Sequence, residues 1–185
     1  MIYVVQVQSR KEDEIVDAIS CLSNPDLIED VFSIKKKRLK KFEGGWHIVV
    51  ETCFKGYVFV KTDHPRSVLS ALSQIDAFTK LISVGREASR IFIPLTLHEE
   101  EMLYKLIGGK EHRIIDISDV RTFDGRIVEV LSGPLKDYEN NIIKTNLHGR
   151  LVTVVDTLIG QDVAFQLGIN MKEKYIDLEN LDLYY

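Results

Sequence analysis

The sequence lacks long apolar runs. No stretch approaches the roughly 18 consecutive apolar residues that a membrane-spanning helix needs. The opening residues, MIYVVQVQ, have no basic segment and no extended apolar segment of the kind found in secretory signal peptides. Their β-branched, alternating pattern predicts a strand instead. We therefore expect a cytoplasmic protein with no membrane partner.

Cysteines are also scarce. The chain has only two, Cys21 and Cys53, without CxxC spacing and without a histidine cluster nearby. Because free cysteines are among the most buried residue types, we expect two buried free thiols. The five histidines show no metal-ligand spacing, so the sequence predicts no metal site and no cofactor.

No complete catalytic motif is present. His98 and Glu99 begin the HExxH pattern of zinc hydrolases, but Met102 occupies the position of the second histidine. The segment 108–110 reads GGK without the upstream glycine or the following Ser/Thr of a phosphate-binding loop. A GxSxG sequence is absent as well. We therefore expect a protein that is not an enzyme.

The net charge of −4 argues against strong non-specific binding of nucleic acid by the whole surface. The charges are nevertheless uneven. Residues 35–41 carry six basic side chains, whereas 99–101 and the last residues are acidic. The basic run fits either a solvated strand end or a face turned toward nucleic acid.

Hydrophobic periodicity in residues 1–109 predicts the order β-α-β-β-α-β-α, which is typical of an α+β fold with helices packed on an antiparallel sheet. A helix is expected after Ser9, with Glu12 as its capping-box partner, and another from Pro65 to Leu72. Thr96 and Glu99 form a second capping box ahead of the last helix. The predicted strands are Ile2–Gln8, Val31–Leu39, Trp46–Glu51, Thr52–Thr62 and Phe78–Val84.

From Ile114 onward the hydrophobic period becomes two, and turn residues recur at short intervals. Short strands separated by frequent turns predict a small all-β barrel. The expected strands are Ile114–Ile117, Ile127–Leu131, Asn141–Thr145, Leu151–Val155 and Asp162–Leu167.

Three segments of the N-terminal half, Tyr3–Gln6, Phe54–Val60 and Pro94–Thr96, together resemble the N-terminal (NGN) domain of the NusG family of transcription factors. Tyr3–Gln6 is similar to the opening WYVVQ strand, and Phe54–Val60 is similar to FPGYVFV with Lys55 in place of proline. Pro94–Thr96, followed by three glutamates, resembles the PL(S/T)xEE entry to the last helix of that domain. The resemblance implies an NGN domain over residues 1–109.

The C-terminal half resembles the KOW domain of the same family, an SH3-like barrel, with turns at Asp124-Gly125 and Ser132–Leu135. This implies a linker over residues 110–118 and a KOW domain over 119–185. Within the family, Lys136–Arg150 looks most like the LoaP-type antiterminators, whose loop reads GPLxGYEGxIxKINRHKR. Here Asp137 and Asn140 replace two glycines, and Gly149 replaces a basic residue.

The resemblance implies a transcription elongation factor that binds the clamp helices of the largest RNA polymerase subunit and promotes processive antitermination. NGN domains make this contact through an aromatic surface, which maps to Gln6, Phe54, Tyr57 and Phe59. The same aromatic residues also fit an ordinary strand core. Alternation places Phe54 and Tyr57 on different faces unless Gly56 marks a bulge.

In the barrel, basic residues beside two loops suit a nascent RNA hairpin, and an aromatic residue between them suits stacking on a base. The candidates are Lys136, Tyr138, Lys144, His148 and Arg150. A solvated barrel rim explains them equally well. The family also implies contact with upstream DNA. The alternatives are a general NusG-type factor whose barrel binds a small-subunit ribosomal protein or Rho, and a KOW protein acting on the ribosome or RNA.

Overall fold

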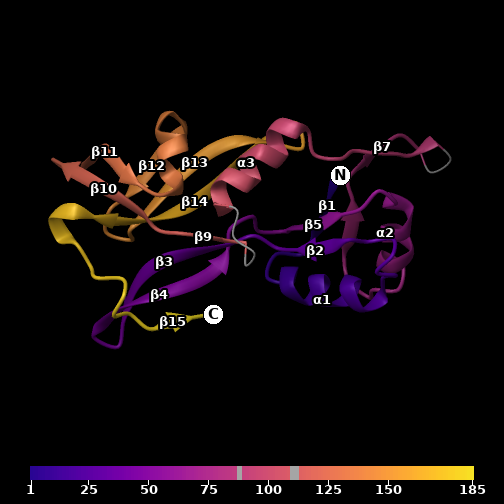
Figure 1. Ribbon diagram of the computed structural model, residues 1–185, viewed down its shortest axis with the longest axis horizontal. Helices are drawn as coiled ribbons and strands as arrows, with labels where there is room; N and C mark the ends of the chain where they lie inside the picture. Colours follow the sequence, from indigo (N-terminus) through magenta and orange to yellow (C-terminus); the bar gives the residue numbers. More distant parts are fainter. Residues whose placement is uncertain (87–88, 109–112) are drawn as a thin grey trace. The chain divides into compact units, whose positions relative to one another are not determined.

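Figure 1 shows the computed structural model of the chain, which describes residues 1–86, 89–108 and 113–185. The chain folds into two compact units. The first comprises Met1–Ser33 and Phe54–Met102, and the second comprises Ile34–Cys53 and Leu103–Tyr185. Residues 34–53 therefore interrupt the first unit and belong to the second.

A four-stranded antiparallel sheet forms the first unit, in the order β2-β5-β1-β6. Its strands are β1 (Ile2–Val7), β2 (Asp30–Phe32), β5 (Tyr57–Lys61) and β6 (Thr79–Leu81). Helices α1 (Glu12–Leu22) and α2 (Pro65–Leu72) bury their apolar stripes against one face of this sheet. The central core residues include Val5, Ile15, Ile19, Val58 and Val68. The predicted α+β class is confirmed for this unit.

The start of α1 differs from the prediction. Ser9 does not cap the helix, because Lys11 is the N-cap residue and makes no side-chain capping bond. Glu12 is buried and accepts a hydrogen bond from the Gly56 N–H at 2.6 Å. Gly56 has a φ of +82°, a conformation that favours glycine, and it lies in the turn before β5. The expected long strand Thr52–Thr62 is therefore broken at this turn.

The last helix, α3 (Leu97–Ile107), begins as the capping box predicts. Thr96 N–H donates to Glu99 Oε2 at 2.7 Å, and Glu99 N–H donates to Thr96 Oγ1 at 3.3 Å. Ahead of it, β7 (Ser83–Val84) and β8 (Ile91–Phe92) form a two-stranded ribbon. Within the described parts of the chain, none of the helices is long and apolar enough to cross a membrane.

A five-stranded sheet in the order β11-β10-β14-β13-β12 dominates the second unit. Its strands are β10 (Ser118–Phe123), β11 (Arg126–Ser132), β12 (Ile142–Asn146), β13 (Leu151–Leu158) and β14 (Gln161–Met171). Four of them match the predicted strands, whereas β10 was not predicted. The segment η2 (Pro134–Asn141), expected as a loop, is a 3-10 helix.

The lysine-rich hairpin also belongs to the second unit. Its strands β3 (Lys35–Phe42) and β4 (Gly45–Thr52) pair along their whole length. The short strands β9 (Ile114–Ile115) and β15 (Leu183–Tyr184) extend this sheet on its two sides, in the order β15-β4-β3-β9. The predicted strand Val31–Leu39 is therefore two strands in different units.

The compact units and the predicted domains have different bounds. The prediction placed residues 1–109 together, but the hairpin within them pairs with β9 and β15 from the C-terminal half. Residues 109–112, which include the start of the predicted linker 110–118, lie outside the described residues. The remainder of that linker contains β9 and the first residue of β10.

The expectation for the two cysteines is confirmed in one case. Cys53 is buried, and this burial raises the pKa of its thiol to about 12. Cys21 is exposed, so the prediction for it is wrong. Its place on α1 explains the difference, because the buried positions of that helix are Glu12, Ile15 and Ile19.

Close backbone packing joins the hairpin to the five-stranded sheet. A Cβ atom added at Gly168 on β14 would lie 2.4 Å from the Lys37 carbonyl oxygen and 3.1 Å from Arg38 Cα on β3. Real Cβ atoms do not approach backbone so closely, and the backbone cannot rotate away as a side chain can. Only glycine fits at this crossing.

We expect Gly168→Ala to destabilise the protein by about 2 kcal/mol or more, because the added methyl group forces β14 away from β3. Urea denaturation measures the loss. Gly45→Ala is the matched control, since its nearest contact would be the His47 side chain at 3.4 Å. Equal stability of the two variants would show that β14 and β3 are not packed this closely.

Candidate functional site

Two of the predicted polymerase-binding residues form a pair on the first sheet. Gln6 on β1 and Tyr57 on β5 are register partners, and both are half-buried. Their neighbours Val5 and Val58 face the helical core, so strand alternation places Gln6 and Tyr57 on the opposite face. This pair is a polar and aromatic patch on the face of the sheet opposite α1 and α2, a face on which Val4 and Phe59 are buried.

The other two predicted residues are buried. Phe54 is 2% exposed and Phe59 is fully buried, and their ring centroids lie 6.0 Å apart in an edge-to-face arrangement. Phe59 also stacks on Phe32, with centroids 5.5 Å apart. Phe54 precedes β5, and its carbonyl oxygen accepts a hydrogen bond from the Tyr57 N–H. A turn, rather than a bulge in a continuous strand, therefore separates Phe54 from Tyr57. In this conformation the two phenylalanines act as core, as the alternative interpretation held.

Three of the five predicted RNA-binding residues are exposed. Lys136 lies on η2, Lys144 on β12, and His148 in the turn between β12 and β13. Tyr138 differs from the prediction, since it is 4% exposed and packs edge-to-face on Phe165. Burial, followed by the charge of Asp156, raises the pKa of its phenol. Its ring therefore has no face available for stacking on a base.

Arg150 also departs from the prediction of a free basic side chain. It is only 3% exposed. Its guanidinium donates to Asn170 Oδ1 at 2.8 Å and to the Lys174 carbonyl oxygen at 2.6 Å. The guanidinium carbon lies 4.8 Å from the centroid of the Trp46 ring, within cation–π range. Burial lowers the pKa of Arg150, but the group still carries its charge.

A cavity of about 360 Å³ lies beside this arginine, within the second unit. Two of the predicted RNA-binding residues, His148 and Arg150, line this cavity together with residues that the sequence did not predict. Its lining includes Trp46, Leu147, His148, Arg150, Glu173 and Lys174. Trp46 is the only tryptophan of the chain, which is the one signal that marks it in the sequence.

Glu173 supplies a fixed acceptor at this cavity. Its Oε2 accepts hydrogen bonds from the Thr122 backbone N–H at 3.1 Å and the Thr122 hydroxyl at 2.9 Å. Backbone hydrogen bonding at Glu173, helped by the bonds from Thr122, lowers the pKa of this carboxyl. The cavity therefore combines basic donors, a charged acceptor and a flat aromatic surface.

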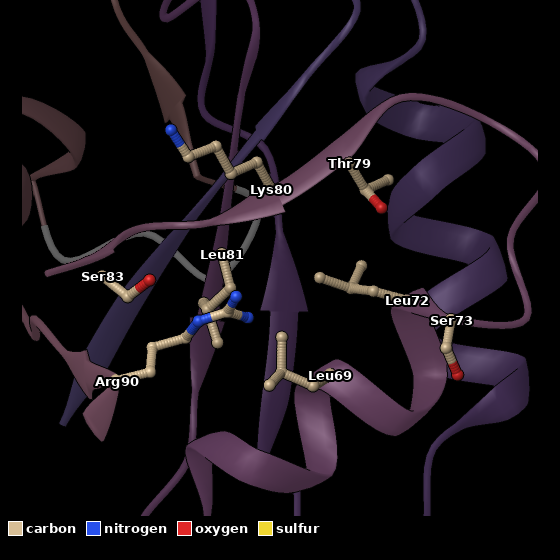
Figure 2. Close-up of a pocket in the computed structure, with 8 residues that line it drawn as sticks. All are labelled: Leu69, Leu72, Ser73, Thr79, Lys80, Leu81, Ser83 and Arg90. Carbon is tan, nitrogen blue, oxygen red and sulfur yellow. The ribbon is translucent and has the colours of Figure 1, made fainter. Parts of the chain in front are cut away.

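A second cavity, of about 490 Å³, lies in the first unit beside α2 and β6. Leu69, Leu72 and Leu81 provide its apolar lining. Figure 2 shows the Arg90 guanidinium extending toward Leu81, whereas the Lys80 amine points away from the leucines. None of the predicted site residues lines this cavity.

A comparison with protein-family models identifies residues 2–104 as matching NusG, described as transcription termination factor nusG. The match runs through the hairpin of residues 34–53, which the structure groups with the C-terminal half. No curated protein matches the chain.

We expect Arg150→Ala to destabilise the protein by about 2–3 kcal/mol, because it removes two hydrogen bonds of a charged donor and the contact with Trp46. Urea denaturation and the emission of Trp46 report the change. Lys144→Ala, at an exposed position, is the control and should leave both unchanged. An unaltered denaturation midpoint for Arg150→Ala would contradict its structural role.

Proposed function

The chain belongs to the NusG family, and we propose that it is an elongation factor that binds RNA polymerase and promotes processive antitermination after recruitment by a nascent RNA hairpin. It acts in the cytoplasm by binding, without catalysing a reaction. The match of residues 2–104 to the family carries the polymerase-binding part of this proposal. The likeness of Lys136–Arg150 to LoaP-type proteins supports the antitermination part.

The polymerase contact is assigned to the half-buried pair Gln6 and Tyr57, on the face of the first sheet opposite α1 and α2. A helical tip docking on a sheet needs an aromatic group with a polar neighbour. Tyr57 and Gln6 supply these groups side by side. Phe54 and Phe59 support the contact indirectly, because their packing holds the turn before β5 and the strand that carries Tyr57.

Tyr57→Ala should weaken binding of the full chain to core RNA polymerase about tenfold or more, as expected for an aromatic anchor. Fluorescence polarisation of the labelled protein measures this affinity. Tyr185→Ala removes an exposed tyrosine outside the first unit and should bind normally. If Tyr57→Ala keeps its fold by circular dichroism and its affinity, the assigned face is wrong.

The RNA contact is assigned to the second unit. The strand order β11-β10-β14-β13-β12 supports an SH3-like KOW barrel. With a net charge of −4, the chain has little general attraction for phosphate, so affinity must come from a local group of cations. Lys136, Lys144 and His148 are the exposed basic residues in the LoaP-like segment. Upstream DNA is a further proposed partner, as the family suggests.

We expect the double change Lys136→Ala and Lys144→Ala to weaken binding to a leader hairpin and to reduce the salt slope of the affinity by about one per lost phosphate contact. Gel-shift titrations at several salt concentrations measure both. A control with Lys11→Ala and Lys55→Ala removes the same charge at exposed sites of the first unit. Equal losses in both double variants would mean that charge alone, and no local site, governs binding.

A specific observation favours a protein partner as the second candidate function of this unit. The edge strands of the five-stranded sheet each expose an apolar side chain, Val128 on β11 and Ile143 on β12. Such residues on unpaired edges suit a partner protein, and a ribosomal protein or Rho is the partner that the family suggests. If no leader hairpin shifts in a gel, this account replaces RNA recruitment.

A further inference from the structure

The cavity beside Arg150 has two flat side chains in its wall. Trp46 comes from the hairpin, and Arg150 from the turn immediately before β13. The guanidinium lies 4.8 Å from the ring centroid, so the arginine is already paired with the aromatic ring. Aromatic rings and guanidinium planes are the surfaces on which proteins stack unpaired bases.

These groups are held in place before any ligand arrives. Asn170 and the Lys174 carbonyl fix the guanidinium at 2.8 and 2.6 Å. The turn that carries His148 is closed by a hydrogen bond from the Gly149 N–H to Asn146 Oδ1 at 2.8 Å. A Cβ at Gly149 would lie 2.7 Å from the Asn146 amide nitrogen, so glycine permits this closure. A fixed wall reduces the entropy lost on binding.

The polar groups of the cavity include both donors and an acceptor. His148 and Lys174 are exposed basic residues, whereas Glu173 is an acceptor oriented by two hydrogen bonds from Thr122. A phosphate alone needs only donors, and the carboxylate would repel it. The edge of a nucleobase presents donors and acceptors together, so it matches this mixture better.

We infer that this cavity holds one unpaired base of an RNA loop, stacked on the half-buried Trp46 ring that Arg150 holds in place, with the edge of the base toward Glu173 and the backbone phosphate near His148. The inference rests on the proposed recruitment by an RNA hairpin and adds the position at which that RNA is read. The volume of about 360 Å³ lies within the range of small-ligand pockets. Stacking and base-edge hydrogen bonds add affinity that does not depend on charge. A protein of net charge −4 needs such a contribution, because its general attraction for phosphate is weak.

The single tryptophan makes the cavity directly observable. We would titrate the full chain with AMP, GMP, CMP and UMP, and with leader hairpins whose loop nucleotides are made abasic one at a time, while recording the emission of Trp46. We expect saturable quenching by at least one mononucleotide and by the intact hairpin. One abasic position should abolish the quenching and weaken hairpin binding at least tenfold.

Two variants test the assignment without relying on Arg150. His148→Ala should weaken the hairpin at least fivefold, and His98→Ala, at an exposed histidine of the first unit, is the matched control. Trp46→Leu should weaken the hairpin, whereas Trp46→Phe should retain binding because a ring remains. Polarisation of labelled RNA gives these affinities, since the two tryptophan variants lack the intrinsic signal.

The outcomes distinguish the proposal that the cavity binds a base from the proposal that an RNA hairpin recruits the protein. A gel shift by the hairpin without quenching, and with His148→Ala binding normally, overturns the cavity as the base site and leaves recruitment intact. Quenching by mononucleotides without any hairpin shift supports the cavity and overturns recruitment. Absence of both signals overturns both proposals.

Discussion

The contact between β14 and β3 at Gly168 is the constraint on which the second unit depends. Because no side chain separates the two backbones there, the lysine-rich hairpin packs directly on the five-stranded sheet. The hairpin then receives β9 along β3 and β15 along β4. The hairpin lies within residues 2–104, which match the family model. In the structure, however, it is part of the second compact unit.

The same packing determines what the basic residues of the LoaP-like segment can do. Trp46 belongs to the hairpin and Arg150 to the turn before β13, so their contact exists only while the hairpin packs on the five-stranded sheet. The guanidinium of Arg150 is occupied by this contact and by its two hydrogen bonds. The exposed basic side chains of this segment are Lys136, Lys144 and His148, and of these His148 lines the cavity.

Local patterns in the sequence predicted local structure well. The capping box at Thr96 and the helix from Pro65 depend on residues within one turn of each other, and both are confirmed. Burial was harder to predict, because it depends on distant partners. Tyr138 is covered by Phe165, and Arg150 by Trp46 and Asn170, none of which lies near it in sequence. Gly56 was predicted within one long strand, and the sequence left open whether it marks a bulge; it lies in a turn, and its partner Glu12 comes from α1.

The long sequence separation between the hairpin and its partners has a consequence for synthesis on the ribosome. Strand β3 leaves the ribosome early, whereas β9, β14 and β15 are made much later. The edges of the hairpin therefore stay unpaired while the rest of the chain is synthesised. Open strand edges invite pairing with other nascent chains, and lysine side chains discourage such pairing. The basic run over residues 35–41 thus discourages such pairing while the chain is still incomplete.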